Sequence, residues 1–140
     1  MIVVDTDLMT GFCVPGLDPT LARRLRACEP RWAMPRVWRA RFRDVVAALV
    51  RAGRLPLDEA VKLEGIAASA LHTGDVESSG KVVLRLAVES GCPAELCEFV
   101  WLARALDVPL VTTQPALLDA FPGTAVEPEA FLSGAPAAAG

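Results

Sequence analysis

Two short, wholly apolar runs, one near each end of the chain, constrain the fold most. Residues 1–5 read MIVVD and residues 110–113 read LVTT. Runs of β-branched residues without polar alternation are typical of parallel strands that are buried on both faces. Parallel strands need long crossover connections, which are usually helical. We therefore expect an α/β protein with helices on both faces of a mostly parallel sheet of about four or five strands, with 1–5 central and 110–113 beside it.

Helical signals fill most of the chain between these runs. Proline at a first turn, glycine at a C-terminus and apolar residues at helical spacing mark the segments. The predicted helices cover residues 18–28, 35–53, 59–71, 76–90, a segment that begins at Pro93, and 115–120; a short extended piece follows at 125–126. Trp38 and Phe42 lie on the apolar face of the second helix, which predicts core positions, with an aromatic platform for bases as the alternative. Trp32 lies in EPRWAMPR, which we interpret as a partly exposed loop.

Composition indicates one packed domain. The 140 residues are 53% hydrophobic and 22% charged, which excludes a disordered chain and suits a single core. We assign residues 1–132 to this domain and expect the small-residue tail, 133–140, to be flexible. No apolar run approaches the roughly 18 residues that span a bilayer, and the start resembles no signal peptide, so we expect a cytoplasmic protein without membrane contact.

The four cysteines and the single histidine show no metal-ligand spacing. Cys13, Cys28, Cys92 and Cys97 are scattered along the chain. A zinc site needs ligands in closer clusters, so we interpret the cysteines as buried thiols of a cytosolic protein.

Charge is distributed unevenly along the chain. Ten arginines lie between residues 23 and 54 against Glu29 and Asp44, which gives this segment +8, whereas the rest of the chain carries −11. Such a block suits a phosphate-bearing or acidic partner. An ordinary solvated surface is the alternative, and the sequence does not decide between them.

Polar residues follow both predicted strands and are the first candidates for a site. Asp5 ends the first run, and Thr113 and Gln114 end the second. Ligands of open parallel sheets bind outside the carboxyl ends of the strands. In isolation, Asp5 also suits the role of a helix cap.

Three segments together carry a family resemblance. They are MIVVDTD, PRVWRARFRDVVAALVRAG and SGCPAELCEFVWLARALDVPLVTTQPALLDAFP. The last segment is the most specific, because its predicted helix, proline-containing turn, strand and second helix all align with the corresponding stretch of the family. The chain resembles, nearly end to end, PIN-domain proteins of the VapC toxin type.

The resemblance implies a three-layer α/β/α domain that cuts RNA with Mg²⁺ or Mn²⁺ held by four carboxylates. Hard divalent cations require oxygen ligands, and the metal activates water and neutralises the phosphoryl transition state. Of the four positions, the first acid is retained as Asp5, whereas the others fall on Arg41, Leu96 and Gln114. A guanidinium is a fixed cation and leucine offers no ligand atom.

Neighbouring acids do not restore the quartet in this interpretation. Asp7 is a weak candidate ligand, Glu95 is expected off the pocket face, and Asp44 is expected toward solvent. We expect Arg41 to supply the countercharge instead, through a two-pronged pair with Asp5. Leu96 would then fill the pocket wall, and Gln114 would bond either partner.

Two functions follow from the resemblance. The first is a PIN-like protein that has lost metal-dependent cleavage, holds no cofactor and keeps a protein- or RNA-binding role. The second is an active Mg²⁺- or Mn²⁺-dependent endoribonuclease toxin with a rearranged ligand set. The resemblance also implies a homodimer and a small antitoxin-like partner.

Overall fold

A five-stranded, all-parallel sheet forms the centre of the protein. The structure is a computed structural model and describes residues 1–134. The strands follow the order β3-β2-β1-β4-β5. Their bounds are β1 Ile2–Val4, β2 Trp32–Pro35, β3 Leu71–Val76, β4 Leu110–Val111 and β5 Ala125–Val126. The predicted α/β class is confirmed, with the first run central and the LVTT run beside it.

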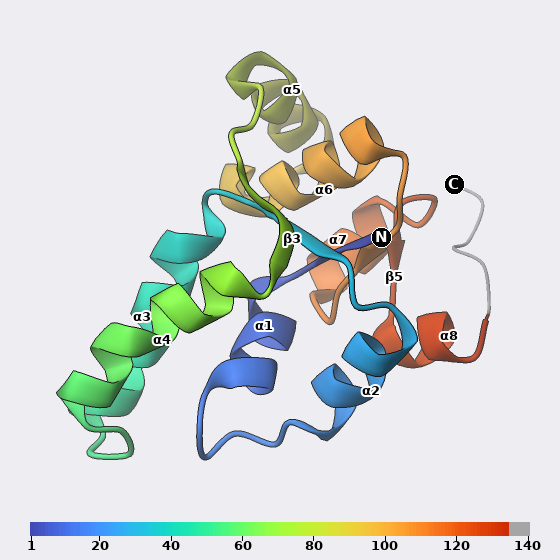
Figure 1. Cartoon of the computed structure of the whole chain (residues 1–140). Helices are drawn as coiled ribbons and strands as arrows, with labels where there is room; N and C mark the ends of the chain where they lie inside the picture. The colour runs from blue at the N-terminus through green and yellow to red at the C-terminus, as the bar shows by residue number, and fades with distance from the viewer. Residues whose placement is uncertain (135–140) are drawn as a thin grey trace.

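Eight helices in the described part of the chain surround this sheet. Figure 1 shows α5 and α6 on one side of it and α1 and α2 on the other. In the same view α3 and α4 run side by side as a hairpin that extends away from the sheet. The bounds are α1 Thr6–Cys13, α2 Thr20–Cys28, α3 Trp38–Arg51, α4 Leu57–Ser69, α5 Gly80–Ser90, α6 Ala94–Leu106, α7 Pro115–Ala120 and α8 Pro128–Leu132.

Strand register brings the polar strand ends to one edge. Val3 pairs with Ala33 of β2 on one side and with Leu110 of β4 on the other. Because all strands are parallel, their carboxyl ends meet at the same edge. The residues that follow β1 and β4 therefore lie next to each other there.

The second strand is where the sequence interpretation was wrong. Trp32 and Pro35 belong to β2, and Trp32 is fully buried rather than partly exposed. The two prolines of EPRWAMPR indicated a loop, but Pro35 occupies the last position of β2, a strand whose register with β3 is irregular between Trp32 and Met34. The following helix begins at Trp38, not at Pro35.

The third strand, β3, was also missed. Its sequence, LHTGDV, is polar, and its middle residues are exposed because it lies at an edge of the sheet. An edge strand lacks the continuous apolar signal of a central one. The helix predicted from residue 76 therefore begins only at Gly80. Two short helices, α1 and α8, were not predicted either.

The buried aromatic residues form the core, as the helical spacing predicted for Trp38 and Phe42. Both are at most 1% exposed, and their rings pack edge to face. Trp32 packs edge to face with Phe12, and the Arg26 guanidinium lies 5.1 Å from the Trp32 ring. Their burial and their edge-to-face packing make Trp38 and Phe42 part of the core rather than a platform for bases.

The cysteines are free thiols with different surroundings. Cys92 and Cys97 are buried, as expected, whereas Cys13 is partly buried and Cys28 is exposed. The buried-thiol interpretation is therefore wrong for Cys28, which lies at the end of α2.

Two further expectations concern membrane contact and the tail. Within residues 1–134, no helix has both the length and the apolar character that crossing a membrane requires. Of the tail predicted at 133–140, Ser133 and Gly134 form the turn after α8, and residues 135–140 lie outside the described part.

A carboxylate cluster rearranged at the strand ends

Asp5 lies directly after β1 and is held by donors from three places. Its Oδ1 accepts the backbone N–H of Leu8 at 2.9 Å, which caps α1. Its Oδ2 accepts the Thr112 hydroxyl at 2.7 Å and the Thr113 N–H at 2.9 Å. The side chain therefore links the start of α1 to the end of β4, which is the capping role that its position also suggested.

Burial dominates the ionisation of Asp5. The residue is 3% exposed, and this desolvation raises the pKa of its carboxyl group. The hydrogen bonds from Leu8, Thr113 and Thr112 act in the opposite direction and compensate in part. The two carboxylate oxygens already accept three good hydrogen bonds, so little lone-pair capacity is left for a metal ion.

The predicted pair between Arg41 and Asp5 does not form. The Arg41 guanidinium instead donates to Glu95 Oε1 at 2.6 Å, which joins α3 to the first turn of α6. The expectation that Glu95 lies off the pocket face was also wrong. Glu95 is next to Leu96 in sequence, and at a helix N-terminus its long side chain reaches sideways to Arg41.

Gln114 bonds a different acid from the one expected. Its Nε2 donates to Asp7 Oδ2 at 2.8 Å, so it contacts neither Asp5 nor Arg41. Its backbone N–H donates to the Thr112 hydroxyl at 3.0 Å, which continues the chain of hydrogen bonds from Asp5. Thr112 is fully buried and was not singled out in the sequence; the pair of hydroxyl residues that ends the LVTT run was the available signal.

A small cavity of about 160 Å³ lies among these side chains. One guanidinium, three carboxylates and two uncharged side chains line it. The lining residues are Thr6, Asp7, Arg41, Asp44, Val45 and Glu95. Asp44 is exposed, as expected, yet it still borders this cavity. The Arg41 guanidinium, which α3 carries, therefore places a fixed positive charge at this cavity.

These residues do not fit a divalent metal centre of the kind that the resemblance implies. Leu96 is 8% exposed and belongs to the core, so it offers hydrocarbon where a ligand would stand. Arg41 would repel the ion, and Oδ2 of Asp5 already accepts hydrogen bonds from Thr112 and Thr113. Within residues 1–134, no three histidine, cysteine, aspartate or glutamate side chains are grouped closely enough to share a metal.

More than half of the arginines in the basic block are paired with carboxylates, most of them from elsewhere in the chain. Of its ten arginines, six lie within 4.0 Å of a carboxylate: Arg24, Arg31, Arg36, Arg39, Arg41 and Arg43. Arg39 and Arg43 share Glu64, and Arg39 also bonds Asp75, so α3 is tied to α4 and to β3. The +8 segment in the sequence is therefore not a +8 surface.

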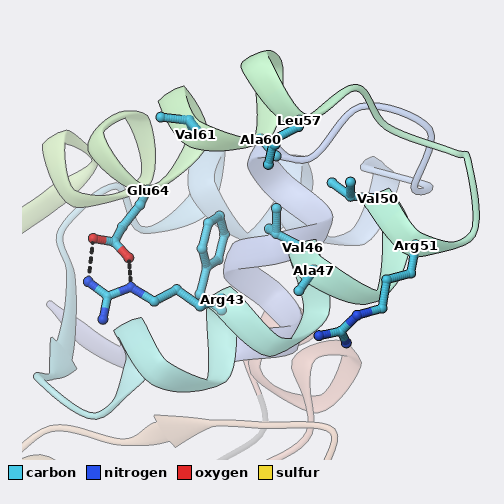
Figure 2. A pocket seen from close by; sticks show the side chains of 10 residues that line it. Arg43, Val46, Ala47, Val50, Arg51, Leu57, Ala60, Val61 and Glu64 are labelled. Carbon is cyan, nitrogen blue, oxygen red and sulfur yellow. Dashed lines mark hydrogen bonds and ion pairs between the residues drawn. The ribbon is translucent and has the colours of Figure 1, made fainter.

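An apolar groove of about 460 Å³ runs between α3 and α4. Figure 2 shows Val46 and Val50 from α3 facing Leu57 and Ala60 from α4. The Arg43–Glu64 ion pair closes one end of the groove, and Arg51 lies toward the other. Sequence analysis did not find this groove, because α3 and α4 separately look like ordinary amphipathic helices.

Comparison with known proteins shows the fold. No known protein-family model and no curated protein matches the sequence. Among solved structures, the chain is similar to the crystal structure of PAE2754 from Pyrobaculum aerophilum, with a TM-score of 0.73 and 19% sequence identity. The match covers 95% of this chain and 94% of that one. The two proteins therefore share an α/β architecture over nearly their whole lengths.

Proposed function

We propose that the protein is a PIN-like protein of the VapC type that has lost metal-dependent RNA cleavage and acts by binding a protein. One observation carries this proposal: the Arg41–Glu95 ion pair occupies the strand-end cavity where the resemblance would place a metal-binding carboxylate. A fixed guanidinium supplies the countercharge that Mg²⁺ would supply in a nuclease.

The surroundings of Asp5 support the same proposal. A carboxylate that serves as a metal ligand keeps oxygen lone pairs directed at the ion. Asp5 directs both oxygens at protein donors, and its contacts join α1 to β4. The one acid retained from the quartet thus has a structural role.

Charge pairing favours a protein partner over RNA. Nucleic-acid affinity depends on cations that are free to replace counterions along the phosphate backbone. Here six of the ten arginines of the basic block already contact carboxylates, and an apolar groove of about 460 Å³ lies between α3 and α4. The homodimer and the small antitoxin-like partner belong to this proposal.

Metal-dependent stabilisation tests the proposal. A cation that binds the folded state raises the melting temperature by mass action. We expect Mn²⁺ and Mg²⁺ to leave the melting temperature of the parent unchanged. A variant that returns carboxylates to two positions, Arg41→Glu/Gln114→Asp, should gain Mn²⁺-dependent stabilisation, because it removes the fixed cation and adds acids beside Asp7.

The alternative function, an active nuclease with a rearranged ligand set, has one observation in its favour. Asp7, Asp44 and Glu95 line the same cavity. Mn²⁺ stabilisation of the parent, together with RNA cleavage that EDTA abolishes and Asp7→Asn removes, would establish this alternative and overturn the proposal. If neither the parent nor the repaired variant responds to Mn²⁺, the assignment of this pocket to a former PIN-type centre is wrong.

A further inference from the structure

Cys92 and Cys97 lie at the start of α6, at two positions that often contact each other at helix N-termini. Pro93 is the N-cap of this helix, so Cys92 directly precedes the cap and Cys97 is the fourth helical residue. Apolar side chains at these two positions commonly pack together and fix the direction in which the chain enters the helix. Here both residues are free cysteines. A contact that is usually made by hydrocarbon is therefore made by two oxidisable groups.

The thiol of Cys97 lies against the residue with which it would pair. It donates to the carbonyl oxygen of Cys92 at 3.8 Å. The Ser90 hydroxyl links the two residues further, because its Oγ accepts the Cys92 N–H at 3.1 Å and lies 3.9 Å from Cys97 Sγ. The backbone of Cys92 and the sulfur of Cys97 are thus already held together.

The thiol of Cys92 points to a different element in the reduced protein. It donates to the carbonyl oxygen of Ala116 at 3.5 Å. Ala116 belongs to α7, which packs against α6 (Figure 1). A change of rotamer about the Cα–Cβ bond moves the Cys92 sulfur from α7 toward Cys97. This rotation is the main change that a bond between the two sulfurs requires.

The first turn of α6 is weakly capped, which gives a small oxidant access to the pair. The ring of Pro93 holds no acceptor, and this N-cap makes no side-chain hydrogen bond. An N-terminus without such a bond leaves N–H groups of its first turn unsatisfied and opens locally more readily than the middle of a helix. Cys92 is 8% exposed and Cys97 is fully buried, so opening uncovers Cys92 first.

We propose that Cys92 and Cys97 form a disulfide when the protein meets a hydroperoxide. The Cys92 thiolate attacks the peroxide: the O–O bond breaks, the alkoxide or hydroxide leaves with the proton that Cys92 lost, and the sulfur becomes a sulfenic acid. The Cys97 thiolate then attacks this sulfur, so that the S–S bond forms and the S–O bond breaks. The departing hydroxide takes the proton of Cys97 and leaves as water. Two thiols and one hydroperoxide thus give one disulfide, one alcohol or water, and one further water.

The disulfide has opposite effects on the two helices. It ties the first turn of α6, which carries Glu95, to the residue before the cap, so this turn opens less often. A disulfide sulfur carries no proton, so the carbonyl of Ala116 loses the hydrogen bond that Cys92 donates to it. Oxidation therefore stiffens the start of α6 and weakens the attachment of α7.

The reaction is slow in the folded protein. Burial is the main cause of the raised pKa of Cys97, and the neighbouring Cys92 adds to it. The attacking thiolate is accordingly scarce. A small hydroperoxide reaches this pair during local opening, whereas a bulky thiol reagent reacts first with the exposed Cys28. The pair thus responds to sustained oxidation.

Peptide mapping of the full chain tests whether the bond forms. After treatment with hydrogen peroxide and removal of the excess, the folded protein should lose about 2 Da, the mass of two thiol hydrogens. Cleavage after Glu95 separates Cys92 from Cys97, so the two fragments should stay joined until a reductant is added. Cys28→Ser is the matched control and should form the same bond. Cys97→Ala should form none and should leave a sulfenic acid on Cys92 that dimedone traps.

Hydrogen exchange tests the consequence of the bond. In the oxidised protein the first-turn amides of α6 should exchange roughly tenfold more slowly, because the disulfide closes a short loop across that turn. The amides of α7 should exchange faster, because one hydrogen bond to it is lost. Reduction should reverse both changes. Cys92→Ala removes the donor to Ala116 without forming a disulfide, so it should show only the faster exchange of α7.

Three results would each overturn the inference. They are thiols at 92 and 97 that stay reduced until urea unfolds the chain, a disulfide that joins either of them to Cys13 or Cys28 instead, and a 92–97 disulfide that leaves the exchange of both helices unchanged. The peptide map of the parent needs no variant, so a Cys97→Ala chain that fails to fold does not remove the test. No arm uses a metal or RNA, so failure here would leave the proposed function standing.

Discussion

The hydroxyl of Thr112 donates a 2.7 Å hydrogen bond to Oδ2 of Asp5 across 107 residues of sequence. Both side chains are buried, and they lie at the carboxyl ends of the neighbouring strands β4 and β1. The Thr112 oxygen also accepts the N–H of Gln114. This contact therefore couples the capped start of α1 to the turn that leads into α7.

Replacing Thr112 by valine tests this coupling. Valine keeps the shape but removes a donor to Asp5 and an acceptor for Gln114, so two buried polar groups lose a partner. We expect the free energy of unfolding to fall by about 1–3 kcal/mol. Thr113→Val is the control, because Thr113 is exposed, its hydroxyl makes only a long 3.4 Å contact with Asp5, and its backbone N–H still reaches Asp5; its effect should stay within about 0.5 kcal/mol. Urea unfolding of both variants measures the difference, and equal losses would contradict the assigned role of Thr112.

The raised pKa of Asp5 gives a pH dependence of known sign. Its carboxyl group has an ordinary pKa of 3.8, and burial raises the pKa in the folded state. The folded protein therefore holds this proton more tightly than the unfolded chain does. The contribution of Asp5 to stability is largest below pH 3.8 and decreases as the pH rises through the folded-state pKa. We expect the parent to lose stability relative to Asp5→Asn as the pH rises over that window, as measured by urea unfolding at several pH values; a parent that gains stability relative to Asp5→Asn as the pH rises would contradict it.

Glu64 provides a pH dependence of the opposite sign. The hydrogen bond from Arg43, which outweighs partial burial, together with that from Arg39, lowers the pKa of Glu64 below its ordinary 4.5. This stabilisation is present above pH 4.5 and is lost as the pH falls through the lowered value. Glu64→Gln should therefore cost about 1 kcal/mol at neutral pH and much less in acid. The melting temperatures of the parent and of Glu64→Gln should approach each other as the buffer becomes more acidic. A difference in melting temperature that does not change with pH would show that the ion pairs of Glu64 with α3 are not the source of the stabilisation.

The four thiols should differ in reactivity. Cys28 is exposed, whereas Cys92 and Cys97 are buried, and burial raises the pKa of Cys13 to about 11. Because thiolate is the reactive form, a disulfide reagent at mildly alkaline pH should modify one thiol rapidly in the native protein. Cys28→Ser should remove that fast phase, and unfolding in urea should expose the remaining thiols. A fast phase that survives Cys28→Ser would show that another cysteine is accessible.

Elements with local signals were predictable from the sequence. β1 and β4 are apolar throughout because both faces of a central parallel strand are covered, and this signal lies in the residues themselves. The helix predicted around 115–120 and the extended piece predicted near 125–126 were also confirmed, since proline at a first helical position fixes the start of α7. In contrast, β3 pairs only with β2 at the edge of the sheet, and its polar sequence carries no strand pattern.

In the candidate site, too, residue identities were readable from the sequence, whereas the contacts between side chains were not. The identities of Asp5, Arg41, Leu96 and Gln114 were enough to show that these four positions do not supply four carboxylates, because residue type alone decides what can ligate a cation. The partner of each side chain was not predictable. Arg41 lies at the edge of its helix's apolar face, and whether it turns toward Asp5 or Glu95 depends on how α3 and α6 approach each other.

The sequence by itself therefore determined the α/β class, the central strands and the lack of a carboxylate at positions 41, 96 and 114, since hydrophobic periodicity and ligand chemistry are properties of individual residues and their spacing. Only the tertiary structure decided the order of the sheet, the capping role of Asp5, the Arg41–Glu95 pair and the groove between α3 and α4. Two of these features depend on contacts between residues far apart in the sequence: Arg41 and Glu95 are separated by 54 positions, and Asp5 and Thr112 by 107. Such contacts arise when whole elements pack, because the geometry of packing selects among several partners that are chemically equivalent in the sequence.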